Sequence, residues 1–219
     1  MPMKTLAIVC QKGGVGKTTL AVNLAVAAHA AGYAAAIADT DPQASCCFWS
    51  DTRAKADIPI QPVFPVRLEH SLKALDRAGC DLAIIDTPPH AKDVSSQAIA
   101  LADFVLIPTK LAAFDIVAMF DSIGQCTARN KPFAVVFSMC PPQDGEEYAY
   151  VMKALAEWHH EVCPVLIHHY VAYPRAQTTG QAAAEIDPNG KAAAEIAQLY
   201  DYTIKHLNLT QPSLRRQLA

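Results

Sequence analysis

The stretch QKGGVGKTT, residues 11–19, determines the fold expected for this chain. Residues 6–10 before it form an apolar run that indicates a buried strand, and residues 20–27 after it are apolar all round and indicate a buried helix. A strand, a glycine-rich turn and a helix together make a phosphate-binding loop, because the N–H groups of the turn and the N-terminus of the helix both attract an anion. The stretch therefore predicts a site for a nucleoside triphosphate.

The residues of this loop have different expected roles. Lys17 is expected to reach the β- and γ-phosphates, and the hydroxyl of Thr18 is expected to ligate Mg²⁺. The spacing G-x-x-x-x-G-K-T requires a glycine at position 11, where this chain has Gln11 followed by a second lysine. The predicted nucleotide contacts within the loop are Lys12, Gly13, Gly14, Val15, Gly16, Lys17, Thr18 and Thr19.

The composition of the 219 residues is that of a globular protein, with 52% hydrophobic and 18% charged residues. A net charge of −3 provides no overall attraction to nucleic acid, so any contact with DNA must come from a local patch. Seven cysteines without a C-x-x-C pair indicate reduced thiols in a cytosolic protein. We expect no signal peptide and no membrane-spanning helix, since no apolar run reaches about 18 residues.

Apolar runs alternate with helical patterns along the chain. This alternation predicts an α/β fold with a doubly wound, mainly parallel sheet and helices on both faces. The predicted strands are residues 6–10, 34–38, 60–64, 82–85, 104–107, 133–138 and 165–167, and the predicted helices are roughly residues 17–31, 43–53, 68–78, 94–101, 114–129, 146–160 and 191–207. We expect one ATPase domain over residues 1–208, followed by a short C-terminal tail, residues 209–219.

Acidic residues follow two of the predicted strands. Ligands of doubly wound sheets bind at the carboxyl ends of the strands, so these residues are expected beside the loop. Asp86 is predicted to hold Mg²⁺ through water, opposite Thr18, in the Walker B role; the alternative is an ordinary cap after a strand. Asp39 and Asp41 are predicted to orient the attacking water and to organise the metal shell. Their alternative interpretation is an Asx turn before Pro42.

Lys12 distinguishes this loop from that of an ordinary ATP-binding protein. Lys17 already serves the phosphates from within its own subunit, so a second loop lysine is superfluous for binding alone. We predict that Lys12 points across an interface, where it neutralises charge that develops on the nucleotide of a second subunit, as an arginine finger does. The alternative is a solvated surface lysine.

Three motifs together carry a family resemblance: KGGVGKTT at residues 12–19, DTDPQ at residues 39–43 and IIDTPPH at residues 84–90. They resemble the deviant-Walker ATPases of the ParA/MinD superfamily, above all small plasmid-type ParA partition proteins, over about residues 4–207. The resemblance implies an ATP-dependent homodimer that binds DNA non-specifically, and a ParB-like or other adaptor that stimulates slow, Mg²⁺-dependent hydrolysis of ATP. It assigns Lys12 to the partner's nucleotide, Asp41 to water positioning and Asp86 to the Walker B role.

Two positions depart from the family pattern. Leu111 stands where a proline is frequent, and Tyr170 stands where an arginine is frequent; both lie outside the phosphate chemistry and bear on adenine packing, the dimer edge or DNA contact. The resemblance implies a cytoplasmic, nucleoid-associated protein. Its candidate DNA contacts are the late basic residues, for which the alternative is ordinary solvated charge: Lys191, Lys205, Arg215 and Arg216.

Two other functions use the same scaffold. A MinD-like membrane-associated regulator needs an amphipathic C-terminal helix, but Leu214 and Leu218 beside two arginines offer little apolar surface, so we expect no stable membrane binding. A metabolic ATP-dependent synthetase needs a substrate pocket and has no use for Lys12.

Paired histidines and cysteines suggest further chemistry. The pairs His159-His160 and His168-His169 lack zinc-type spacing and are expected at a surface or interface. The pair Cys46-Cys47 is expected to serve packing.

Overall fold

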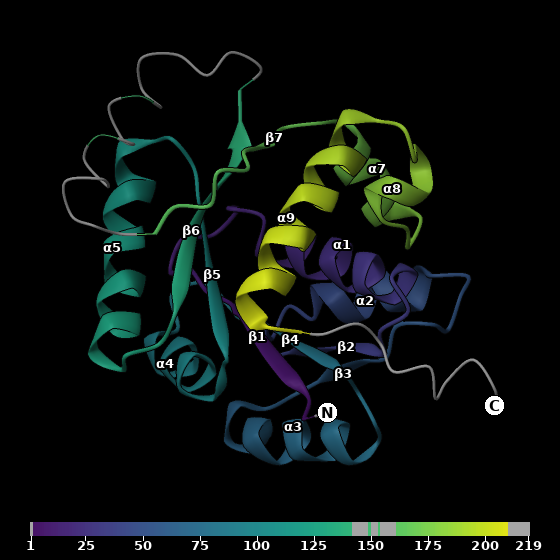
Figure 1. Ribbon diagram of the computed structural model, residues 1–219, viewed down its shortest axis with the longest axis horizontal. Coiled ribbons are helices and arrows are strands. Elements are labelled where there is room, and N and C mark those ends of the chain that lie inside the picture. Colours follow the sequence, from purple (N-terminus) through teal and green to yellow (C-terminus); the bar gives the residue numbers. More distant parts are fainter. Residues whose placement is uncertain (1, 142–148, 150–152, 154–160, 210–219) are drawn as a thin grey trace.

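A single seven-stranded sheet forms the centre of the protein (Figure 1). The computed structural model describes residues 2–141, 149, 153 and 161–209. The strands lie in the order β3-β2-β4-β1-β5-β6-β7, and all described pairings are parallel. Their bounds are β1 (Lys4–Ile8), β2 (Ala35–Asp39), β3 (Ile60–Pro62), β4 (Leu82–Asp86), β5 (Phe104–Thr109), β6 (Phe133–Cys140) and β7 (Ile167–His168). The predicted doubly wound parallel sheet is confirmed.

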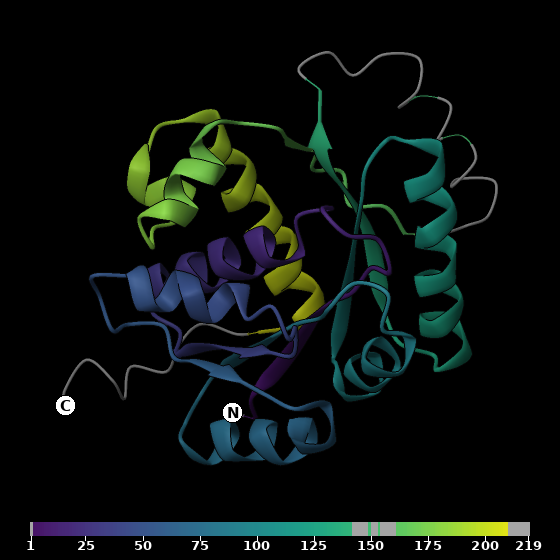
Figure 2. The same cartoon turned by 180° about the vertical axis from the view of Figure 1, so that it is seen from behind.

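Helices cover both faces of the sheet (Figure 2). One face packs against α1 (Lys17–Ala30), α2 (Ser45–Thr52), α7 (Ala172–Thr178), α8 (Ala183–Ile186) and α9 (Lys191–Leu207). The other face packs against α3 (Leu68–Arg77), which follows the short helix η1 (Pro65–Arg67), and against α4 (Lys92–Leu101) and α5 (Ala113–Ala128). Within the described ranges, no helix has the length and apolarity that a bilayer crossing requires.

Successive strand residues point to opposite cores, because side chains alternate across a strand. In β1, Leu6 and Ile8 enter the core beneath α1 and α9, whereas Ala7 enters the core beneath α4 and α5. Both sets are fully buried, which explains why the strands are continuous apolar runs. Helix α1 packs against β2 and β4 of the sheet and, on its other sides, against α9 and α2, which agrees with the buried helix predicted there.

Most predicted elements are present within one or two residues. The strand predicted at residues 165–167 is present as β7, which begins two residues later: the chain first pairs with β6 at Val162, Pro164 supplies no N–H to continue the ladder, and pairing resumes at Ile167. Helices α7 and α8 were not predicted. The helix predicted at residues 146–160 lies outside the described residues, apart from residues 149 and 153.

Candidate nucleotide-binding site

The glycine-rich loop lies at the carboxyl edge of the sheet, between the central strand β1 and helix α1. Asp86 at the end of β4 is in register with Ile8 of β1 on one side and with Asp39 of β2 on the other. The parallel register therefore brings the loop and two of the predicted carboxylates to one edge, as expected from the ends of the strands.

The loop closes on itself and is fixed by neighbouring strands. Gly14 and Gly16 have φ angles of 69° and 83°, in the left-handed region that favours glycine. The hydroxyl of Ser138 in β6 donates to the carbonyl oxygen of Val15 over 2.7 Å. The ammonium of Lys17 donates to the carbonyl oxygen of Lys12 over 3.1 Å, inside the curl of the loop. Burial lowers the pKa of Lys17, and the nearby Cys10, Asp86 and Asp41 oppose that shift.

Thr18 and Asp86 form a contact suited to a divalent cation. The Thr18 hydroxyl donates to Asp86 Oδ2 over 2.6 Å. Asp86 is fully buried, and its Oδ1 has no hydrogen-bond partner among the described residues. Burial raises the pKa of the Asp86 carboxyl to about 7, against the lowering effect of the Thr18 hydrogen bond. Mg²⁺ prefers oxygen ligands. The Thr18 hydroxyl and the Asp86 carboxylate, whose Oδ1 has no partner among the described residues, therefore fit the predicted metal.

Asp39 and Asp41 differ in how much of each carboxylate is occupied. Asp39 is buried, and its two oxygens accept the backbone N–H groups of Asp41, Cys46 and Cys47 at 3.1–3.3 Å. It thereby caps the start of α2, and burial raises the pKa of its carboxyl. Asp41 is half-buried, and its Oδ1 accepts the N–H of Gln43 over 2.9 Å, as in an Asx turn. Asp41 therefore keeps one oxygen that accepts no hydrogen bond from the described residues and is available for other chemistry.

Lys12 and Thr19 lie at the two ends of the loop. Lys12 is half-buried, and its ammonium has no hydrogen bond or ion pair within the part of the chain that the structure describes. Its backbone N–H donates to the sulfur of Cys10 over 3.4 Å. Thr19 Oγ1 accepts a hydrogen bond from Gln177 Nε2 of α7 over 2.8 Å, which connects the loop to a helix that was not predicted.

A small cavity of about 180 Å³ lies beside the loop and was not anticipated from the sequence. It has a largely apolar wall, which suits the flat face of a nucleotide base. It is lined by Gly16, Thr19, Leu20, Ser138, Met139, Ile167, His168, His169, Tyr173, Pro174 and Gln177. These residues come from three distant segments without a shared motif, so only the rule that ligands bind at strand ends pointed to this region.

The remaining predicted residues are dispersed. Lys191 begins α9 and Lys205 lies near its end, about 21 Å away at 1.5 Å per residue. Both lysines are exposed, whereas Arg215 and Arg216 lie outside the described residues. The DNA contacts predicted in one chain therefore do not form one compact cluster among the described residues.

The second histidine pair is attached to α9. His168 Nδ1 lies 2.8 Å from Glu195 Oε1, and its backbone N–H donates to Glu195 Oε2 over 2.9 Å. Tyr170, one of the two departures from the family pattern, donates its hydroxyl to Glu195 Oε1 over 2.8 Å. No group of three metal-binding side chains occurs in the described ranges, and His159-His160 lies outside them.

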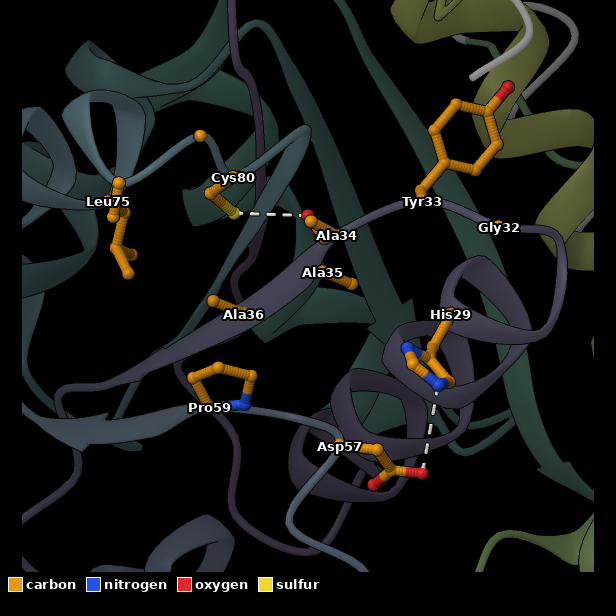
Figure 3. A pocket seen from close by; sticks show the side chains of 12 residues that line it. His29, Gly32, Tyr33, Ala34, Ala35, Ala36, Asp57, Pro59, Leu75 and Cys80 are labelled. Carbon is orange, nitrogen blue, oxygen red and sulfur yellow. Dashed lines mark hydrogen bonds and ion pairs between the residues drawn. The ribbon is translucent and has the colours of Figure 1, made fainter. Parts of the chain in front are cut away.

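A larger cavity, of about 570 Å³, lies at the opposite edge of the sheet (Figure 3). Figure 3 shows His29 paired with Asp57, their nearest atoms 3.9 Å apart, and the Cys80 thiol donating to the carbonyl of Ala34 over 3.2 Å. The amino-terminal end of β2 lines this larger cavity, and none of the predicted phosphate contacts does. Its size alone gives it no role in the chemistry of the loop.

A parallel sheet with a glycine-rich loop after its central strand defines a P-loop nucleotide-binding protein. A family model described as "CbiA: CobQ/CobB/MinD/ParA nucleotide binding domain" matches residues 6–183. This chain therefore belongs to the ParA/MinD family of nucleotide-binding ATPases, and the resemblance found in the sequence is confirmed.

Similar proteins agree with this assignment. The chain is 30% identical to the "Maintenance of carboxysome distribution protein A" of Gloeobacter kilaueensis, over 88% of this chain and 93% of the relative. It is 25% identical to "Protein IncC" of Escherichia coli, over 95% of this chain and 71% of the relative. Among solved structures, apo McdA of Cyanothece matches with a TM-score of 0.76 at 19% identity, covering 94% of this chain and 99% of that one, which shows the shared fold.

Proposed function

We propose that residues 1–208 form a ParA-like ATPase domain that positions a cargo by switching between an ATP-bound homodimer and a released state. Family membership supports the nucleotide chemistry, and a similar protein named for carboxysome distribution supports the positioning of cargo. The cargo class is a DNA molecule or a large protein assembly. Residues 209–219 form the tail of this domain.

We assign the proposed steps of the reaction to residues of the loop and to the carboxylates beside it. Lys17 leaves the Lys12 carbonyl to bind the phosphates, and the cavity beside Thr19 receives the base. Thr18 and, through water, Asp86 would hold Mg²⁺, which would neutralise charge on the phosphates. Asp41, with its available oxygen, orients the attacking water. Hydrolysis then yields ADP and phosphate.

The observation that carries the proposal is the unpartnered ammonium of Lys12. A lysine in a phosphate loop normally serves its own nucleotide, but Lys17 already occupies that place in this chain. Lys12 has no partner among the described residues, so its charge is available to the nucleotide of a second copy. This arrangement favours a switch completed by dimerisation over a metabolic synthetase, which works without a loop lysine from a partner.

The proposed dimer binds DNA non-specifically, and an adaptor protein stimulates hydrolysis. Both parts rest on the family resemblance rather than on a charged cluster in one chain. Dimerisation would place two copies of Lys191 and Lys205 in one assembly, where phosphate contacts add up. The proposed location is the nucleoid, with no stable binding to membranes.

Replacing Lys12 tests the dimer. Lys12→Ala is expected to retain nucleotide binding, to lose the ATP-dependent dimer in sedimentation velocity and to slow ATP turnover about 100-fold, as for loss of a transition-state donor. Lys73→Ala is the control, because Lys73 pairs with Glu69 on the exposed face of α3. Unchanged dimerisation and turnover in Lys12→Ala would contradict the cross-subunit role.

DNA binding is tested with three nucleotide states. We expect retention of a random-sequence duplex with Mg²⁺ and ATP, and release with ADP or without nucleotide. Equal binding in all three states would rule out the switch, and turnover that requires a small acid and ignores DNA would favour a synthetase.

A further inference from the structure

The thiol of Cys46 lies against the carboxylate proposed to hold the metal. Cys46 is the second residue of α2 and is fully buried. Its S–H donates to Asp86 Oδ2 over 3.3 Å, and the hydroxyl of Thr18 donates to the same oxygen over 2.6 Å. The sequence predicted a packing role for this cysteine, and the structure adds a polar contact with the site.

The backbone fixes the position of this thiol. Asp39 Oδ2 accepts the N–H of Cys46 over 3.1 Å and the N–H of Cys47 over 3.3 Å, at the start of α2. Asp39 is in turn in register with Asp86 across β2 and β4. The helix that carries the thiol is therefore attached to the strand beside the one that carries Asp86, and the thiol cannot move far from the carboxylate.

The two donors leave the carboxylate asymmetric. Asp86 Oδ2 accepts two hydrogen bonds, whereas Oδ1 is buried and accepts none from the described residues. An unsatisfied buried oxygen is costly unless a ligand or water satisfies it. The donors on Oδ2 thus decide which oxygen stays available for a water molecule bound to the metal.

We infer that Cys46 is a positioning residue for Asp86. Its S–H bond to Oδ2 acts with that of Thr18 to hold the carboxylate plane, so that Oδ1 faces the water shell of Mg²⁺. This inference rests on the proposed function, since it concerns the binding of Mg²⁺ with the nucleotide. Residues that orient a metal-holding group typically affect metal affinity by one to two orders of magnitude.

The test compares Cys46→Ala, which removes the donor, with Cys46→Ser, which replaces it by a hydroxyl. Binding of a fluorescent ATP analogue is titrated with Mg²⁺ and repeated in EDTA. Cys46→Ala is expected to raise the half-saturating Mg²⁺ concentration about tenfold, and Cys46→Ser to restore it to within about threefold. Binding in EDTA stays equal in all variants. Cys126→Ala is the matched control, because it removes another fully buried thiol, from α5 in the other core.

A spectroscopic measurement reads the bond without metal or nucleotide. The S–H stretching band in the infrared difference between wild type and Cys46→Ser is expected below the position of a free thiol, because hydrogen bonding weakens the S–H bond. An unshifted band, or a wild-type Mg²⁺ requirement in Cys46→Ala, would overturn this inference alone. A wild-type protein that binds no nucleotide would overturn the proposed function as well.

Discussion

At the scale of single residues, the backbone of Gly16 limits what the loop tolerates. Its φ of 83° is left-handed, and a Cβ added there would meet no atom within 4 Å, so a substitution is opposed by backbone strain alone. We predict that Gly16→Ala destabilises the protein by about 1–2 kcal/mol and abolishes nucleotide binding, because the loop N–H groups turn away from the phosphates. Urea unfolding and a fluorescent nucleotide measure the two effects.

Gly124 provides the control for this prediction. It lies inside α5, its φ is not in the left-handed region, and a Cβ there also meets no atom within 4 Å. Gly124→Ala is expected to stabilise the protein by about 0.5–1 kcal/mol with nucleotide binding intact. Normal nucleotide binding by Gly16→Ala would contradict the conformational argument.

The two acidic residues after β2 are expected to separate into a structural and a chemical role. Asp39→Asn replaces one of the two accepting oxygens by an NH₂ group and leaves a backbone N–H without its acceptor, so we predict a loss of about 1–2 kcal/mol in the free energy of unfolding. Asp41→Asn is expected to change stability little and to lower ATP turnover about 100-fold, because its free oxygen orients water. Wild-type turnover in Asp41→Asn would contradict the proposed role of Asp41 in orienting water.

At the scale of elements, one buried arginine connects α2 to α8. The side chain of Arg53 is 3% exposed and pairs with Glu185 at 2.7 Å and with Asp57 at 2.7 Å. Burial acts to raise the pKa of Glu185, but hydrogen bonds from Arg53, Ala182 and Lys55 lower it to about 2. Helix α7, which precedes α8, contacts the loop through the hydrogen bond from Gln177 to Thr19. The Arg53 pair with α8 therefore also supports the nucleotide site.

We predict that Glu185→Gln destabilises the protein by about 1–3 kcal/mol at pH 7. The folded pKa of Glu185 lies below its unfolded value near 4.5, so its contribution is present above pH 4.5 and is lost as the pH falls toward 2. The stability difference between variant and wild type should shrink over that window in urea unfolding. Glu69→Gln removes an exposed pair with Lys73, which also lowers the pKa of Glu69, so it should show a pH dependence of the same sign but much weaker, because solvent screens the pair.

The elements differ in how well the sequence predicted them. Strands such as β4 and β5 are continuous apolar runs between turn residues, so the hydrophobic pattern alone was sufficient to predict them. Helices α7 and α8 are short and carry no apolar period of their own; Pro174 and Gly180 interrupt the pattern, and tertiary contacts such as Gln177 to Thr19 hold them. The loop and Asp86 were predictable because motif spacing encodes them, whereas the cavity proposed for the base depends on packing between distant segments.

At the scale of the whole molecule, dimerisation should appear in thermal stability. A ligand that binds only the folded state raises the melting temperature, by about 5–10 °C at 100 times its Kd for a domain of this size. With Mg²⁺ and ATP, we predict a further rise of about 2 °C for each tenfold increase in protein concentration, because the dimer also binds only folded chains. Differential scanning fluorimetry over a concentration series measures this effect.

ADP provides the comparison for this prediction. With Mg²⁺ and ADP, the melting temperature should rise above that of the free protein but stay independent of protein concentration. Lys12→Ala with ATP should behave like wild type with ADP. The same concentration dependence with either nucleotide would mean that the dimer does not report the state of the nucleotide.

The central position of β1 also affects how the chain is made. Its neighbours β4 and β5 begin at Leu82 and Phe104, so the first strand to leave the ribosome lacks its first partner until about 80 more residues have been synthesised, and its second partner until about 100 more. At the usual ~5–20 residues per second this takes about 5–20 s. Such non-local pairing slows folding and exposes an apolar segment to aggregation. The nucleotide loop is thus translated first but completed late, and a nascent chain gains its ATP site only after β5 has emerged.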